Sequence, residues 1–313
     1  MKTWKDKLFW ITTKLKILKF QIFVKYVSPK LKDVYSEVNT IITTRPDYII
    51  KLQGRLGNQM FQYAFSKCLK GNVLFDRSPL ETQKFAKYQL GKFNLNIKTI
   101  KTQILADFEE KHKLKSGFGF IDTETIKPPV YLDGYYQNEK YFIEYKDELI
   151  KEFTTTAKMT DEYLKMAEKI ENSNSVLLNF RVAEDYKNIN WTVSYDYQKK
   201  AIEYIKERVQ NPEFFVFADD INEVKRSFRT DEKLTFVDIG KNNPDKVYLD
   251  LELMKKCKYD ILTNSSFSFW AGWLNQNPNK IVIAPDPWIQ ENDGVVPDDW
   301  IKIRAEKIKK GLI

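Results

Sequence analysis

A small group of charged side chains directly follows an apolar run of strand length and offers the first candidate for chemistry. Arg181, Glu184 and Asp185 come after the apolar segment Ser175–Phe180. An arginine at a strand end can hold a diphosphate through two hydrogen bonds, and a nearby carboxylate can order it, bind a sugar hydroxyl or accept a proton. An isolated Arg–Asp pair is more often a surface ion pair. The segment is therefore a candidate catalytic site, with a surface ion pair as the alternative.

Two adjacent acids, Asp219 and Asp220, end the next apolar run at residues 214–218. Paired carboxylates at such a place can bind the edge of a base, a ribose or a metal ion. One of the two can instead cap the helix that follows. Both interpretations stay open from the residues alone.

A third polar segment lies where an apolar run turns into an aromatic helix. It holds Asn264, Ser265, Ser266 and Ser268. Hydroxyl groups and free backbone N–H groups at a helix start attract anions, because the N-terminal end of a helix carries partial positive charge. A plain helix cap accounts for one hydroxyl, but not for three serines and an asparagine together.

A glycine-rich turn at residues 54–59 has the sequence Gly-Arg-Leu-Gly-Asn-Gln. Glycines let a backbone approach a ligand, and Arg55 adds a positive charge to Gly57, Asn58 and Gln59. The spacing fits neither the dinucleotide fingerprint nor the P-loop. A tight turn without a ligand is the alternative.

Short apolar runs alternate with helical patterns along the chain. The strands and helices that they predict would position all the polar segments described above. Such alternation predicts parallel sheets of the doubly wound kind, whose ligands bind beyond the carboxyl ends of the strands. The predicted strands are residues 48–53, 73–76, 130–136, 175–180, 214–218, 234–237, 259–262 and 281–284. The predicted helices are residues 58–69, 139–153, 161–171, 195–209, 221–228, 247–256 and 267–274. We expect three regions: a basic aromatic arm (1–46), an N-terminal α/β domain (47–155) and a C-terminal Rossmann-like domain (156–313).

The scarcity of histidine and cysteine excludes several chemistries. The chain has one histidine, His112, in a charged stretch where we expect it on the surface. A two-histidine zinc site is impossible, and a Ser-His-Asp hydrolase would depend on this residue alone. Cys68 and Cys257 lie in helical patterns and are expected to be buried free thiols.

The net charge of +8 belongs to the N-terminal arm, because residues 1–32 hold nine lysines and one acid while the remainder is neutral. No general nucleic-acid surface is therefore expected. The arm has an imperfect amphipathic pattern over residues 4–22 and no apolar run long enough to span a bilayer. It either lies on an anionic membrane surface, the favoured interpretation, or packs on the body as an extra helix. We accordingly expect a cytoplasmic protein, peripheral on the inner face of the membrane.

Several blocks together resemble glycosyltransferase family 11, the α-1,2-fucosyltransferases of bacterial type. They are residues 54–64, Leu-Asp-Gly-Tyr-Tyr-Gln at 132–137, Phe-Ala-Asp-Asp at 217–220, residues 250–254, Asn-Ser-Ser-Phe-Ser-Phe-Trp at 264–270 and Ile-Ala-Pro at 283–285. The resemblance implies a GT-B-like fold, with two Rossmann-like halves facing across a cleft. Residues 47–155 would form the acceptor-side domain and residues 156–313 the nucleotide-sugar-binding domain. It also implies GDP-fucose as donor, inversion at the anomeric carbon, and neither a metal nor a cofactor.

The same resemblance implies roles for the candidate residues. Arg181 contacts the diphosphate, Asp219 or Asp220 the guanine or ribose, and Ser265, Ser266 or Ser268 the phosphates, while the turn at 57–59 closes over the diphosphate. The family's His-x-Arg-Arg-x-Asp is altered, because Asn179 and Val182 stand at its first and fourth positions and an extra residue precedes Asp185. We expect transfer of fucose to a galactose 2-hydroxyl of a glycan, in surface polysaccharide or O-antigen synthesis. Two alternatives remain: another GDP-deoxyhexose as donor, and a weakened carbohydrate-binding homologue. An epimerase is disfavoured, because no dinucleotide fingerprint precedes Tyr195 and Lys199.

Overall fold

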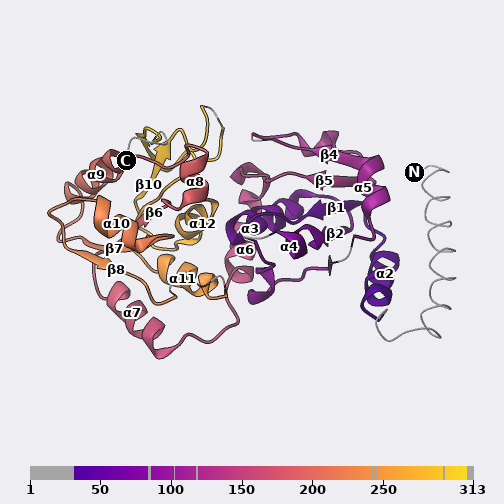
Figure 1. Ribbon diagram of the computed structural model, residues 1–313, viewed down its shortest axis with the longest axis horizontal. Helices are drawn as coiled ribbons and strands as arrows, with labels where there is room; N and C mark the ends of the chain where they lie inside the picture. The colour runs from indigo at the N-terminus through magenta and orange to yellow at the C-terminus, as the bar shows by residue number, and fades with distance from the viewer. Residues whose placement is uncertain are drawn as a thin grey trace.

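The computed structural model describes residues 32–308, except 84–85, 102, 118, 241–242, 244 and 292. It contains two separate parallel sheets with helices around them (Figure 1). The first sheet has the order β3-β2-β1-β5-β4, and each of its pairs is parallel. Its strands are β1 (Tyr48–Lys51), β2 (Val73–Asp76), β3 (Thr99–Ile100), β4 (Lys113–Lys115) and β5 (Val130–Asp133).

The second sheet has the order β11-β10-β9-β6-β7-β8 and is also parallel throughout. The strands are β6 (Ser175–Phe180), β7 (Glu213–Ala218), β8 (Leu234–Phe236), β9 (Tyr259–Ile261), β10 (Val282–Asp286) and β11 (Ile301–Arg304). The chain starts in the middle at β6, which is buried along its whole length, moves outward to β8 and returns to β9. The order therefore reverses between β6 and β9, where doubly wound sheets bind their ligands.

The helices connect and cover these strands. They are α2 (Lys32–Thr44), α3 (Leu56–Phe65), α4 (Ser78–Thr82), α5 (Ala106–His112), α6 (Lys146–Glu152), α7 (Asp161–Glu171), α8 (Glu184–Asn188), α9 (Tyr195–Lys206), α10 (Ile221–Ser227), α11 (Val247–Met254) and α12 (Ser266–Leu274). Short 3-10 turns are η2 (Ser66–Cys68), η3 (Leu90–Lys92), η4 (Thr123–Thr125), η5 (Glu139–Tyr141) and η6 (Ile143–Tyr145). Residues 153–160 connect the two halves and include the predicted domain boundary.

The two halves meet where α3 packs against α12. The indole N–H of Trp270 on α12 donates to the carbonyl of Gly57 on α3 at 3.0 Å. A Cβ added to Gly57 would lie 2.4 Å from the amide nitrogen of Phe267, so only glycine fits this approach. Phe61 of α3 packs in the same core as Phe269 and Trp270. Because α3 follows β1 and α12 follows β9, this contact makes the carboxyl ends of the two sheets face each other.

Most of the predicted elements are confirmed, including every predicted strand. The single helix predicted for residues 139–153 is wrong, because η5, η6 and α6 divide that segment. The break falls at Phe142, whose φ of −139° and ψ of 5° are not helical. Its ring lies at the junction of the halves, between Phe61, Trp270 and Trp273. Packing at the junction therefore overrides the local helical pattern.

Part of the predicted arm is a helix of the folded body. In α2, Val38 and Ile41 are buried, and Ile41 shares an apolar cluster with Ile49 and Leu74 of the first sheet. The amphipathic pattern of residues 4–22 lies outside the described residues. Over the part of the chain that is described, no helix is long and apolar enough to cross a membrane.

The predictions for the single histidine and the two cysteines have different outcomes. Both cysteines are free thiols as predicted, and Cys257 is buried while Cys68 is half-buried. His112 was expected to be solvated on the surface, but its ring is half-buried. It stacks on Phe108, with ring centroids 4.5 Å apart.

Candidate active site

Arg181 lies at the carboxyl end of β6, beside the point where the strand order reverses. Its side chain is only 9% exposed and donates hydrogen bonds to Asp219, after β7, and to Asp185, on α8. The guanidinium also lies over the ring of Tyr186, 4.3 Å from its centroid. Two carboxylates and an aromatic face thus fix the planar donor group in one orientation.

Asp219 shapes the turn that follows β6. It accepts hydrogen bonds from the backbone N–H groups of Val182 at 2.8 Å and Ala183 at 3.2 Å, in addition to the Arg181 guanidinium. Its neighbour Asp220 caps α10, because Oδ1 accepts from the backbone N–H of Glu223 at 2.9 Å. Asp219 therefore positions Arg181, and Asp220 is the N-cap of α10.

A second guanidinium reaches the site from the other half of the molecule. Arg55, in the turn after β1, lies 3.2 Å from Oδ2 of Asp185, the same oxygen that Arg181 contacts. The side chain of Arg55 is 50% exposed and that of Asp185 45%, while Glu184 beside it is exposed. Arg55 and Arg181 therefore stand on either side of one accessible carboxylate, between the facing ends of β1 and β6.

The electrostatic environment keeps Arg181 charged. Burial opposes the charge, but Asp219, Tyr186 and Asp185 outweigh it, so the pKa of the Arg181 guanidinium is raised. The pKa of the Tyr186 phenol is also raised, first by burial, although the charge of Arg181 acts in the other direction. Tyr186 is therefore a neutral hydrogen-bond donor beside a permanent cation at ordinary pH.

Tyr186 links Arg181 to the start of α12. Its hydroxyl donates to the carbonyl of Asn264 at 3.1 Å, directly before Ser265 and Ser266. Both serines are half-buried at the N-terminal end of α12. The strand-end arginine and the serine segment, which are more than 80 residues apart in the chain, therefore belong to one site.

Two side chains of the segment 264–268 form hydrogen bonds within the protein and are buried. Ser268 is fully buried and donates to the carbonyls of Thr263 and Ser265, each at 3.0 Å. Asn264 is fully buried as well, and its amide donates to the carbonyl of Trp191 at 2.8 Å. These two side chains hold the start of α12 in place, and Ser265 and Ser266 are the more accessible members.

The turn at residues 54–59 also combines a buried side chain that serves the fold with side chains that are partly accessible. Gln59 is fully buried, and its amide bonds to the carbonyls of Gly54 and Lys87 and to the N–H of Gln89. Asn58 is half-buried and accepts from the Gln137 amide at 2.8 Å. Gln59 thus fixes the turn, while Arg55 and Asn58 are its partly accessible side chains.

The residues that depart from the family pattern are well packed. Val182 is 3% exposed, and Asn179 is 7% exposed with its amide donating to the carbonyl of Phe217 at 3.0 Å. Among the described residues, none donates a hydrogen bond to the buried Oδ1 atom of Asn179. The sequence did not indicate a role for Tyr186, because no helix was predicted after Arg181. The spacing of five residues between Arg181 and Tyr186 predicts a contact only if the helix α8 is known.

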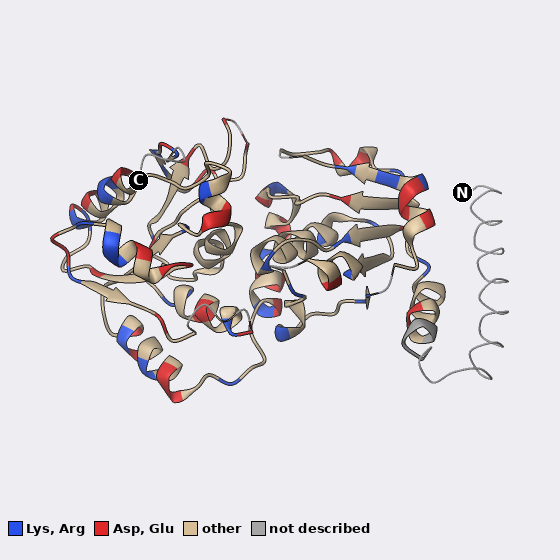
Figure 2. Ribbon diagram, viewed as in Figure 1, with Lys and Arg blue, Asp and Glu red and all other residues tan. Residues whose placement is uncertain are grey.

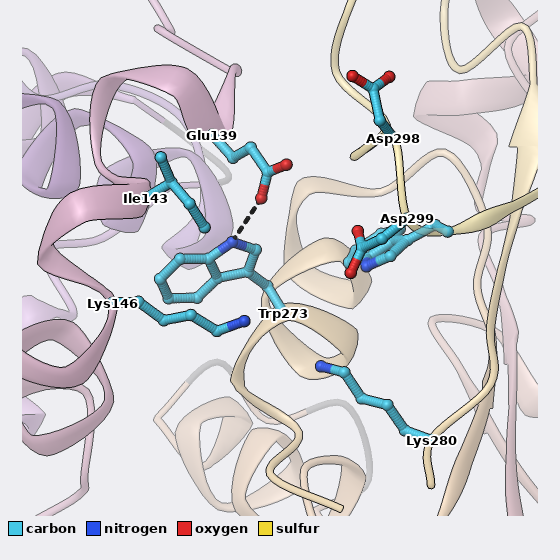
Figure 3. Close-up of a pocket in the computed structure, with 8 residues that line it drawn as sticks. Glu139, Ile143, Lys146, Trp273, Lys280, Asp298 and Asp299 are labelled. Carbon is cyan, nitrogen blue, oxygen red and sulfur yellow. Dashed lines mark hydrogen bonds between the residues drawn. The ribbon is translucent and has the colours of Figure 1, made fainter. Parts of the chain in front are cut away.

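Two cavities of the described structure lie away from these residues. One, of about 230 Å³, opens at the junction of the halves, where Trp273 donates to Glu139 at 3.1 Å (Figure 3). Lys146 of α6 lies beside the Trp273 ring there, 5.4 Å from its centroid. The other, of about 480 Å³, lies along α7 and the segment after β8. None of the predicted site residues lines either cavity, so the candidate site is defined by its side chains.

No cluster of three or more His, Cys, Asp or Glu side chains suited to a metal ion occurs among the described residues. The expectation of metal-free chemistry stays a prediction.

The chain belongs to glycosyl transferase family 11, because the model of that family matches residues 11–304. It is 29% identical over 293 residues to the alpha-1,2-colitosyltransferase of Escherichia coli, covering 82% of this chain and 98% of that protein. It is 25% identical over 304 residues to the O-antigen biosynthesis glycosyltransferase WbnK of Escherichia coli, with 80% and 99% covered. The galactoside 2-alpha-L-fucosyltransferase Sec1 of Mus musculus is 22% identical over 242 residues, with 72% and 64% covered.

Solved fucosyltransferases are more distant. NodZ from Bradyrhizobium gives a TM-score of 0.37 at 11% identity, covering 72% of this chain and 91% of that one. A mutant of Arabidopsis thaliana FUT1 in complex with GDP gives 0.42 at 12% identity, covering 96% and 82%. Because these TM-scores are low, the fold assignment rests on the two parallel sheets of this structure and not on the solved relatives. Their facing carboxyl ends confirm the predicted GT-B-like arrangement of two Rossmann-like halves.

Proposed function

We propose that this glycosyltransferase moves a deoxyhexose from a GDP-linked donor to a hydroxyl group of a glycan. Fucose is the first candidate for the sugar, and a galactose 2-hydroxyl is the first candidate for the acceptor. The observation that carries the proposal is the guanidinium of Arg181, oriented by Asp219 and Asp185 and facing Arg55 from the other half. Two such cations between facing strand ends suit a diphosphate.

The proposed reaction is a single displacement with inversion. The acceptor oxygen attacks the anomeric carbon while the bond from that carbon to the β-phosphate oxygen breaks, and GDP leaves with the electron pair. The acceptor proton passes to a carboxylate, for which Asp185 and Glu184 are the candidates, and then to solvent. Arg181, Arg55 and the N-terminal end of α12 would stabilise the negative charge that develops on the departing GDP.

The remaining donor-site assignments stay part of the proposal. Ser265, Ser266 and Asn58 are accessible enough for direct contact with the donor. Gln59, Asn264 and Ser268 would act by shaping the backbone. The position of Asp219 favours orientation of Arg181, and a contact of Asp219 or Asp220 with guanine or ribose remains a prediction.

A second donor, GDP-colitose, is favoured by a specific observation. The relative of 29% identity is named as a colitosyltransferase, whereas the identity to the fucosyltransferase of Mus musculus is 22%. Asn179 and Val182 also differ from the pattern of the fucosyltransferases, next to the arginine that would hold the diphosphate. Colitose is therefore the alternative sugar.

Calorimetry with GDP, UDP, GDP-fucose, GDP-colitose and GDP-mannose tests the donor, with and without EDTA. We expect GDP to bind at least about tenfold more tightly than UDP, a difference of roughly 1.4 kcal/mol. EDTA should leave the affinity unchanged. Absence of GDP binding, or its loss in EDTA, would contradict the proposal.

Product analysis tests the transfer itself. Incubation of the preferred donor with methyl β-galactoside should release GDP and give an inverted glycosidic linkage, which NMR can assign to a hydroxyl position. Binding of donor and acceptor without release of GDP would favour the weakened carbohydrate-binding homologue.

We place the acceptor on a lipid-linked surface glycan at the inner face of the membrane. One relative is named for O-antigen biosynthesis, and residues 1–32 account for the net positive charge of the protein. A basic arm would hold the enzyme near an anionic surface where such glycans are assembled.

A further inference from the structure

The carboxyl edge of the first sheet carries a polar cluster that the proposed donor site does not use. Asp133, at the end of β5, is its centre. Its Oδ2 atom lies 3.2 Å from the Lys51 ammonium, on β1, and 3.0 Å from that of Lys113, on β4. Its Oδ1 atom accepts from the Gln53 amide at 3.0 Å. The two strands that flank β5 thus direct polar groups to one carboxylate.

The cluster is partly open to solvent and is ionised. The side chain of Asp133 is 12% exposed, that of Lys51 20% and that of Lys113 26%. Burial opposes ionisation, but the hydrogen bonds from Lys113 and Lys51 outweigh it, so the pKa of Asp133 is lowered. A charged carboxylate with two lysines is a poor general base but a strong hydrogen-bond acceptor.

The cluster has hydrogen-bonding capacity to spare. A carboxylate accepts about four hydrogen bonds, and the described contacts supply three of them. The Lys51 ammonium has further N–H donors beyond the one directed at Asp133. An acceptor site beside free donors matches neighbouring sugar hydroxyls, because each hydroxyl both donates and accepts.

An aromatic side chain accompanies the cluster. Tyr135, two residues after Asp133, is half-buried. Burial raises the pKa of its phenol, and the charge of Asp133 adds to this in the same direction. Tyrosine provides a flat apolar face together with a polar tip, the combination that suits a sugar ring.

The cluster is also joined to the proposed reaction centre. Gln53 contacts Asp133, and Arg55, two residues further, contacts Asp185. From Lys51 to Arg55 the backbone can extend over at most about 14 Å. The two contacts therefore come from one short segment after β1, and charges of both signs are interspersed over this half (Figure 2).

We infer that Asp133, Lys51 and Tyr135 form the subsite for the acceptor sugar, with neighbouring hydroxyls on Asp133 and Lys51 and the ring beside Tyr135. The inference rests on the proposed function and assigns its acceptor side. Lys113 and Gln53 are positioning residues, because they hold the carboxylate of Asp133.

Two variants test the subsite, Asp133→Asn and Lys51→Met, with methyl β-galactoside as acceptor. The acceptor KM should rise about tenfold or more in each, since a hydrogen bond to a charged group is lost. The Kd for GDP and the rate of donor hydrolysis without acceptor should stay within about twofold. Glu124→Gln is the matched control, because Glu124 pairs with Lys70 at 2.8 Å on the exposed surface and should change none of these values.

Deoxygenated acceptors separate binding from a structural role. Wild-type protein should bind the 3-deoxy or the 4-deoxy galactoside more weakly than methyl β-galactoside. In Asp133→Asn, removal of that same hydroxyl should cause little further loss of affinity, because its partner is already absent. If Asp133→Asn fails to fold, Lys51→Met and Tyr135→Leu carry the same test. An unchanged acceptor KM in folded variants would overturn the subsite, as would a parallel fall of all parameters with Tm.

The controls also separate this inference from the proposed function. Wild-type protein that binds no GDP contradicts the function itself. Wild-type protein that hydrolyses the donor, but neither binds nor glycosylates any of the methyl glycosides of galactose, glucose and N-acetylglucosamine, contradicts the subsite alone.

Discussion

Arg181 shows how a single side chain is prepared for a ligand. Asp219 is held by two backbone N–H groups and in turn holds the arginine, while Tyr186 covers one guanidinium face. The cost of ordering a long side chain is therefore met during folding rather than on binding. The arginine presents a fixed planar fork instead of a mobile charge.

The first prediction concerns this fork. Arg181→Lys keeps the charge but loses the planar pair of donors, so kcat/KM should fall about 10- to 150-fold, equivalent to roughly 1.5–3 kcal/mol. Arg181→Ala should lose more. Steady-state kinetics with GDP-fucose and a galactoside measure both, and Tm should stay close to that of wild type, because Asp219 keeps its backbone hydrogen bonds.

Arg208→Lys is the matched control for Arg181→Lys. Arg208 also stacks on a tyrosine, with its guanidinium 3.6 Å from the Tyr204 centroid, but it is 42% exposed on the surface. Its replacement should leave kinetics unchanged. Equal turnover of Arg181→Lys and wild type would remove the bidentate role of Arg181.

At the scale of elements, the contact between α3 and α12 sets the relation of the two sheets. It combines the Trp270–Gly57 hydrogen bond with aromatic packing around Phe61. Both helices begin at the carboxyl ends of strands, so the same contact that joins the halves also brings Arg55 to Asp185. Stability and site geometry are therefore coupled through these two helices.

The second prediction follows from this contact. Gly57→Ala would place a Cβ 2.4 Å from the Phe267 nitrogen and 2.5 Å from the Ser266 carbonyl carbon, so the backbones must separate. The free energy of unfolding should fall by about 1–3 kcal/mol, as for other overpacked sites. Chemical denaturation measures the change, and donor affinity should fall as well, because Arg55 moves with α3.

Gly91→Ala provides the comparison for Gly57→Ala. The nearest atom to its added Cβ is a Tyr88 ring carbon at 3.4 Å, an ordinary contact, so stability and donor affinity should be nearly unchanged. Similar stability of the two alanine variants would show that the close approach of the helices is not required.

At the scale of the whole molecule, the basic arm is distinct from the neutral body. The body includes α2, whose Val38 and Ile41 are buried, so the arm proper ends before Lys32. A truncation that tests the arm must therefore leave α2 in place.

The third prediction concerns this arm. Deleting residues 1–31 should abolish most binding to anionic vesicles, since each lysine near such a surface contributes about 1 kcal/mol. Activity on a water-soluble galactoside should be retained. Vesicle sedimentation at low and physiological salt measures the effect, and full-length protein with lysines 14, 16, 19 and 25 changed to glutamine separates charge from aromatic insertion. Equal vesicle binding by the full and truncated proteins would refute the membrane role.

The sequence by itself determined the parallel α/β architecture, the family and the strand ends that carry Arg181, Asp219 and the serines. These features depend on local alternation and on residues adjacent in the chain, which a sequence displays directly. It also indicated that one of Asp219 and Asp220 could cap a helix, and Asp220 is the N-cap of α10.

Only the tertiary structure decided which side chains are available to a ligand and which serve the fold. Gln59 and Ser268 occupy the same segments as Arg55 and Ser266, yet they are buried and bonded within the protein. The break at Phe142 and the cluster at Asp133 also arise from contacts between distant segments. Burial and partnership depend on what the rest of the chain brings against a residue, and local spacing carries no record of that.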